Sequence, residues 1–107
     1  MMNIGTMLEL TRKVDEETAL DQLAEEAVEL AHAALKLQRI RRGNSPSPVT
    51  EADAMRKLME EASDVTVCLE LLACKGINLP IAEIVNAKAW RWLDRIKAKE
   101  EETNEAD

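Results

Sequence analysis

The hydrophobic positions of this chain recur every three or four residues over long stretches, which is the spacing of an amphipathic helix. The clearest stretch is 16–42, where neither Gly nor Pro interrupts the pattern. Its apolar stripe consists of Leu20, Leu23, Ala24, Ala27, Leu30, Ala31, Ala34 and Leu35. Such a helix would be about 40 Å long, whereas a compact chain of about 100 residues is only ~26 Å across. We therefore expect the chain to self-associate in order to cover this helix.

Shorter signals predict a helix on either side of this stretch. Thr6 with Glu9 has the form of a capping box and opens a helix over 6–14. The next helix can be capped by Asp15 or by Thr18, and the sequence leaves both open. After a Pro- and Ser-rich linker, Thr50 caps a helix over 51–75, and Gly76 is placed to end it.

A fourth helix is predicted over 81–99, followed by an acidic tail over 100–107 that we expect to be frayed. We find no strand pattern and no internal repeat. The predicted fold class is all-α, a four- to five-helix bundle in a single domain over 1–99 that is completed by oligomerisation.

Composition narrows the range of partners. Charged residues make up 33% of the chain and the formal net charge is −7, so a nucleic-acid backbone is disfavoured. A nucleotide is not disfavoured, because its phosphates can arrive bridged by a divalent metal. The longest uncharged run is too short to span a bilayer and the N-terminus lacks a signal pattern, so we expect a cytoplasmic protein without a membrane partner. Cys68 and Cys74 are expected to be buried free thiols.

Two pairs of acidic residues are the strongest candidates for chemistry. Glu26 and Glu29 are three residues apart on one predicted helix, as are Glu61 and Asp64 on another. On a helical wheel Glu61 borders the apolar stripe of its helix, so these carboxylates should be partly desolvated. Such groups must take up protons or cations, and hard oxygen ligands suit magnesium or manganese. The acidic run 25–29 alone would be an ordinary solvated face, and it is the second pair that favours a metal site.

The pattern Glu25-Glu26-x-x-Glu29 followed by Glu61-x-x-Asp64 resembles the signature of the MazG-like, all-α nucleoside triphosphate pyrophosphohydrolases. The flanking words Gln22-Leu23-Ala24 and Ala62-Ser63-Asp64-Val65 fit as well, and the likeness covers about residues 15–96. The resemblance implies that a nucleoside triphosphate is cleaved between its α and β phosphates to the monophosphate and pyrophosphate. It also implies Mg²⁺, with Mn²⁺ as a substitute, bound by Glu26, Glu29, Glu61 and Asp64. Glu25 would orient or deprotonate the attacking water.

A basic face on the fourth predicted helix supplies the complementary charge. Lys88, Arg91 and Arg95 are spaced i, i+3 and i+7, and similar positions follow the acidic motifs in the resembling family. We expect them to bind substrate phosphates or to pair with the acids; an ordinary solvated helix face is the alternative.

Two other functions remain open at this point. The chain could be a non-catalytic helical oligomerisation module whose acids are surface charge. It could also be a di-iron carboxylate bundle, because His32 follows Glu29 by three residues, although such bundles use two Glu-x-x-His motifs and this chain has one His. The pyrophosphohydrolase is the preferred interpretation, as a homodimer or homotetramer.

Overall fold

A computed structural model describes residues 2–43, 48–77 and 82–106, and every element in these ranges is a helix. The helices are α1 (Ile4–Lys13), α2 (Glu16–Arg42), α3 (Glu51–Cys74) and α4 (Ala82–Ala106). The all-α prediction is therefore confirmed. The chain divides into two compact units, Met1–Ile77 and Asn78–Asp107, and each is described by itself. The predicted single domain over 1–99 depends on how these two units associate, so it stays a prediction.

Side-chain caps and glycines set the helix ends. Asp15 accepts a hydrogen bond from the Thr18 backbone N–H at 2.7 Å, so Asp15 is the cap of α2 rather than Thr18. Gly43 ends α2 in the left-handed conformation at φ 69°, where a side chain would be strained. Thr50 caps α3 by accepting from the Asp53 N–H at 3.1 Å, and Gly76 follows α3 at φ 95°. The predicted bounds of the two long helices are thus confirmed to within one residue.

Two predicted helix ends are wrong. The first helix begins at Ile4 and not at Thr6, because the Asn3 side chain accepts from the Thr6 N–H and so caps the helix earlier. The last helix continues to Ala106, so residues 100–106 are helical where a frayed tail was predicted. No Gly or Pro follows Pro80, and the Ala, Glu and Lys residues near this end are strong helix formers. The predicted start of this helix at residue 81 lies outside the described residues.

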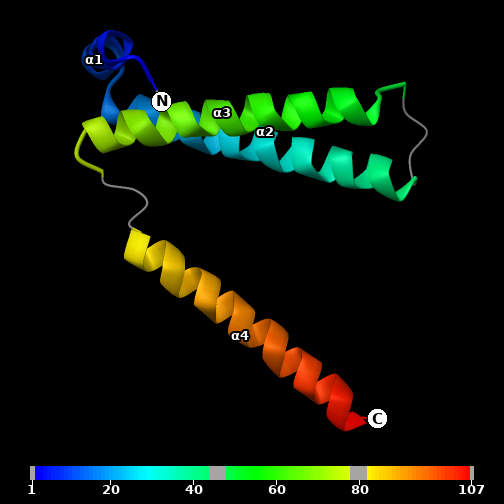
Figure 1. The fold of residues 1–107 in the computed structure, drawn as a ribbon. Coiled ribbons are helices and arrows are strands. Elements are labelled where there is room, and N and C mark those ends of the chain that lie inside the picture. Colours follow the sequence, from blue (N-terminus) through cyan, green and yellow to red (C-terminus); the bar gives the residue numbers. More distant parts are fainter. Residues whose placement is uncertain (1, 44–47, 78–81, 107) are drawn as a thin grey trace. The chain divides into compact units, whose positions relative to one another are not determined.

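Helices α2 and α3 form an antiparallel hairpin and lie side by side along their length (Figure 1). Their facing positions recur every three or four residues, the spacing of helices that pack almost parallel to one another. On α2 the buried or half-buried positions are Ala19, Leu23, Glu26, Leu30, Ala33, Leu37 and Ile40. On α3 the corresponding line is Ala54, Leu58, Glu61, Val65, Cys68 and Leu72. We call these two lines together the α2–α3 seam.

The end of the hairpin nearest α1 holds the main apolar cluster. Ala19, Leu71 and Leu72 are buried there, and Leu10 and Val14 from the α1 region pack against them. Two hydrogen bonds tie the N-terminal segment to α3: the Lys75 ammonium donates to the Thr11 carbonyl at 2.9 Å, and the Met2 N–H donates to Glu70 at 3.2 Å. At the opposite end Arg41 pairs with Glu51 across the two helices. The hairpin is thus fixed at both ends, which sets which residues of α2 and α3 face each other between them.

The α2–α3 seam buries only part of the apolar surface of α2. Leu20, Val28 and Leu35 are 44%, 53% and 59% exposed, although the long helix was expected to be covered. Cys74 is exposed too, so only Cys68 of the two free thiols is buried as predicted. The unit Met1–Ile77 therefore leaves a second apolar face of α2 open to solvent.

Candidate metal centre

Two acidic residues occupy positions in the α2–α3 seam that an apolar side chain would normally fill. Glu26 is half-buried on α2, and Glu61 is only 5% exposed on α3. Among the described residues, Glu61 is the only charged side chain that is buried. Burying a carboxylate costs free energy unless the charge is compensated. An acid at this position therefore calls for a positively charged partner.

Asp64 completes a group of three carboxylates. One oxygen from each of Glu26, Glu61 and Asp64 lies within 4.8 Å of the other two. Glu26 comes from α2 and the other two come from α3, three residues apart and so on one side of that helix. Asp64 is exposed, so the group has one side open to solvent and the other inside the seam.

The separation of these oxygens is suitable for a divalent cation. Mg²⁺ binds oxygens at about 2.0–2.1 Å, so two of its ligands on opposite sides are about 4.2 Å apart. Ligands on adjacent sides of the ion are about 2.9 Å apart, so the three oxygens, which lie within 4.8 Å of one another, would move closer together by rotation of the Glu26 and Asp64 side chains. The donor set is all oxygen, which suits Mg²⁺ or Mn²⁺ better than zinc. The three residues thus fit the expected ion.

Two neighbouring side chains bind the carboxylates of Glu61 and Glu26 in this structure. The Lys57 ammonium lies 2.8 Å from a Glu61 oxygen, and the Gln22 amide donates to Glu26 at 2.8 Å. The hydrogen bond to Glu61, together with the charge of Glu61, raises the pKa of Lys57 above 10.5. Smaller contributions from the charges of Glu60 and Glu29 act in the same direction. Lys57 is therefore a cation at neutral pH and compensates the buried Glu61.

A pocket of about 210 Å³ opens beside the carboxylates. Its lining consists of Gln22, Glu26, Asp64, Val67 and Cys68. Burial raises the pKa of the Cys68 thiol above 9.0, and the charges of Glu26 and Asp64 raise it further. The thiol is consequently neutral at neutral pH and acts as an uncharged wall. Oxygen atoms are the charged donors that face this pocket.

The other predicted acids are not in this group. Glu29 and Glu25 are exposed on α2, and neither belongs to the three-carboxylate group found among the described residues. Glu29 is near enough to act on Lys57 through its charge. Roles for Glu29 as a fourth ligand and for Glu25 as a base stay predictions. His32 is exposed and lies outside this group of described residues, and a di-iron site stays a prediction.

Lys88, Arg91 and Arg95 lie on α4 and are exposed. Their i, i+3, i+7 spacing puts them on one face of that helix, as predicted. They belong to the unit Asn78–Asp107, whereas the carboxylates belong to Met1–Ile77. Phosphate binding by these three cations therefore stays a prediction.

Sequence reasoning missed two residues of this site. Lys57 precedes Glu61 by four residues, and Gln22 precedes Glu26 by four. Side chains four apart on a helix are neighbours, so the i, i+4 positions around each acid were the signal that could have found them.

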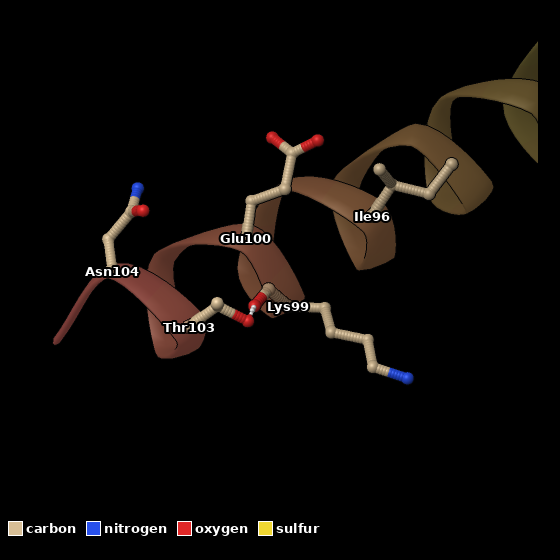
Figure 2. A pocket seen from close by; sticks show the side chains of 5 residues that line it. All are labelled: Ile96, Lys99, Glu100, Thr103 and Asn104. Atoms are coloured by element: carbon tan, nitrogen blue, oxygen red, sulfur yellow. Dashed lines mark hydrogen bonds between the residues drawn. The ribbon is translucent and has the colours of Figure 1, made fainter. Parts of the chain in front are cut away.

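A hollow on α4 does not qualify as a second site. It has a volume of about 410 Å³ and is lined by Ile96, Lys99, Glu100, Thr103 and Asn104. Figure 2 shows that all five side chains project from consecutive turns of one helix, and the Thr103 hydroxyl is engaged with the Lys99 carbonyl at 3.1 Å. A single helix cannot enclose a ligand, so this hollow is a groove between its own side chains.

Comparison with known proteins gives no match: no protein-family model, no curated protein and no solved structure is significantly similar to the chain. In the described part of the chain, no helix has the length and apolarity needed to cross a membrane.

Proposed function

We propose that this protein is a metal-dependent nucleoside triphosphate pyrophosphohydrolase of the MazG-like all-α type. It cleaves an NTP or dNTP between the α and β phosphates and releases the monophosphate and pyrophosphate. The observation that carries the proposal is the convergence of Glu26, Glu61 and Asp64 from two helices, with Glu61 buried in the seam. Carboxylates that meet in a partly desolvated place are the usual way to bind Mg²⁺ for phosphate chemistry.

In this proposal Glu26, Glu61 and Asp64 hold the cation, and Glu29 reaches it from its exposed position on α2. A bound Mg²⁺ or Mn²⁺ neutralises phosphate charge and lowers the pKa of a bound water. Such an ion would displace Lys57 from Glu61 and would compensate the buried carboxylate in its place. The displaced ammonium would then be available to a phosphate oxygen.

Glu25 is the proposed general base. It lies one residue before Glu26 and is exposed, so its carboxylate can take a proton from the attacking water. The water oxygen forms a bond to the α phosphorus, and the bond from that phosphorus to the bridging oxygen breaks. Pyrophosphate leaves with the bridging oxygen, and Lys88, Arg91 and Arg95 bind the phosphate charge.

The active form is proposed to be a homodimer or homotetramer. Three exposed apolar side chains on α2 are Leu20, Val28 and Leu35. They are spaced by eight and seven residues and therefore share one face of the helix. On α4, Trp92 and Ile96 are 65% and 44% exposed and four residues apart. Exposed apolar side chains that share one face of a helix favour a surface that another chain covers.

The Lys57–Glu61 pair favours a second candidate function. Because Glu61 is already compensated by an ammonium at 2.8 Å, the seam could be a purely structural arrangement in a non-catalytic oligomerisation module. In that case the carboxylates would position the two helices and bind no cation.

Pyrophosphate release distinguishes the two candidates. The full chain would be incubated with a panel of NTPs and dNTPs, with Mg²⁺ and then with excess chelator. We expect release that depends on the metal and falls by more than about 100-fold in Asp64→Asn and Glu61→Gln, because even outer-shell changes around a metal cost 10–100-fold. Glu60→Gln is the matched control, since Glu60 is the exposed neighbour of Glu61 and is not one of the three carboxylates. No release from any triphosphate, together with no calorimetric heat from Mg²⁺ or Mn²⁺, would overturn the proposal and favour the module.

A further inference from the structure

A second hollow, of about 540 Å³, adjoins the carboxylate pocket. Its lining consists of Met2, Ser63, Thr66, Val67 and Glu70. Val67 lines both hollows, so the two are neighbours on the surface of α3. The α3 residues of the lining are spaced i, i+3, i+4 and i+7 and therefore share one face of the helix, with Met2 forming the opposite wall. A molecule bound at the carboxylates can extend past Val67 into this space.

The polar atoms of this second hollow are acceptors. The Ser63 hydroxyl donates its hydrogen to the Met59 carbonyl at 2.8 Å, and the Thr66 hydroxyl donates to the Ala62 carbonyl at 2.9 Å. A hydroxyl has one hydrogen to donate and two lone pairs that accept, so each oxygen has only acceptor capacity left. Glu70 accepts from the Met2 N–H through one oxygen and retains further lone pairs. Among the described residues, the side chains that line the hollow therefore offer acceptors to a ligand and no free donor.

The distance along α3 suits the body of a nucleotide. Glu70 follows Asp64 by six positions, which corresponds to about 9 Å along the helix axis. A nucleotide whose phosphates lie at Asp64 would place its sugar over Val67 and its base near Thr66 and Glu70. The apolar Val67, 40% exposed, offers a surface for the sugar or for a face of the base.

We propose that this hollow is the nucleoside subsite and that it selects bases with an amino group at the position of cytosine N4 or adenine N6. The inference rests on the proposed function, because it takes the carboxylate pocket as the place where the phosphates bind. Cytosine N4 and adenine N6 are donors, and a glutamate is a suitable acceptor for such an amino group. Uracil and hypoxanthine carry a carbonyl oxygen at the same position, which would face the lone pairs of Thr66 and Glu70 without a hydrogen between them.

Two matched pairs of substrates test the inference, because CTP differs from UTP, and ATP from ITP, only by an amino group in place of a carbonyl and the ring proton that goes with it. We expect kcat/KM for the amino-bearing member of each pair to be higher by about tenfold, the lower part of the range for a well-placed hydrogen bond to a base. Glu70→Gln supplies an amide donor in place of one acceptor, and Thr66→Val removes a hydroxyl acceptor. Both should move each ratio towards one.

Thr11→Val is the matched control. The Thr11 hydroxyl makes the same kind of bond, to the Met7 carbonyl at 2.7 Å, but Thr11 does not line the hollow. This variant should retain the ratios of the unchanged protein. Ratios near one in the unchanged protein, or ratios unaltered in both Glu70→Gln and Thr66→Val, would overturn the subsite.

Binding of CMP and UMP, measured by calorimetry without metal, separates this inference from the proposed function. Tighter binding of CMP that is lost in Glu70→Gln supports the subsite, even if no triphosphate is cleaved. Cleavage of triphosphates without any base preference would leave the pyrophosphohydrolase in place and remove the subsite. Absence of any preference in both binding and cleavage also overturns it.

Discussion

The Lys57 ammonium lies 2.8 Å from a carboxylate oxygen of Glu61, one turn further along the same helix, and thereby compensates the buried acid of the α2–α3 seam. Lys57 itself is largely exposed. The pair thus joins an exposed cation to a buried anion. A divalent ion that binds Glu61 must compete with this ammonium, so the lysine sets how readily the site is occupied.

Replacing the lysine should make the site easier to fill. In Lys57→Gln the competing charge is gone, and we expect the affinity for Mn²⁺ to rise by up to about fivefold, the range of an exposed ion pair. Calorimetric titration of the metal-free protein with Mn²⁺ measures this affinity. Arg56→Gln is the control, because Arg56 pairs with Asp53 and not with the site. An unchanged Mn²⁺ affinity in Lys57→Gln would show that the ion does not use Glu61.

Metal binding should stabilise the fold, because the ligands come from two different helices. At a Mn²⁺ concentration 100 times Kd, the free energy of unfolding should rise by about 2.7 kcal/mol if the ion binds only the folded chain. Thermal unfolding followed by circular dichroism gives the shift. Glu61→Gln and Glu26→Gln should lose it, and Glu60→Gln should keep it. A similar rise in all of these variants would place the ion elsewhere.

The apolar cluster near α1 should carry much of the hairpin's stability. Leu72 is fully buried against Ala19 and Leu71, so Leu72→Ala should reduce the free energy of unfolding by about 3 kcal/mol. Chemical denaturation measures this loss. Leu8→Ala, at a residue that is 60% exposed, should change it by less than about 1 kcal/mol. Equal losses in the two variants would contradict the cluster as described.

The two aspartates at the starts of α2 and α3 should make the protein sensitive to acid. The hydrogen bond with Thr18 lowers the pKa of Asp15 below 3.8, and the one with Thr50 does the same for Asp53. Since both folded-state pKa values lie below the unfolded value, this stabilisation is complete above about pH 4 and is lost as the pH falls through the folded values.

The variant Asp15→Asn tests this pH dependence, because Asn caps a helix about as well as Asp and does not titrate. We expect its Tm at pH 7 to stay close to that of the unchanged protein. Between pH 4 and about pH 2 its Tm should fall less steeply. Parallel Tm curves for the two proteins over this range would show that the Asp15 cap does not contribute to acid sensitivity.

The exposed face of α2 should determine assembly. Val28→Glu with Leu35→Glu puts two charges on this face, and we expect the oligomer to dissociate to monomers in sedimentation experiments. Lys36→Glu is the control, because it also adds negative charge to exposed α2. A monomer for the unchanged protein would refute the proposed assembly outright.

Periodicity was sufficient to predict the two long helices, because Thr50, Gly43 and Gly76 mark their ends plainly. It could not show which face of α2 packs on α3. Alanine and leucine occur around most of that helix, and α3 lies against the line through Ala19, Ala33 and Leu37. Small alanines there permit close approach of the backbones, a property that a count of apolar positions does not measure.

The candidate site was predicted in part. Glu26, Glu61 and Asp64 do meet, since their spacing follows the same helical repeat as the seam. Glu61 was expected at the edge of its apolar stripe and lies inside the seam. Neither Lys57 nor Gln22 was foreseen, because a charge or amide four residues away matters only once the acid is known to be buried.

The antiparallel hairpin has a consequence for changes in chain length. Adding or deleting one residue within α2 between Glu26 and Gly43 would turn Glu26 by 100° and move it 1.5 Å relative to its partners on α3. Since Arg41 and Glu51 join the helices at one end and Ala19 packs with Leu71 and Leu72 at the other, such a change could not be absorbed by sliding. Insertions and deletions among natural forms of this protein should therefore occur between residues 43 and 50, and the lengths of α2 and α3 should stay constant.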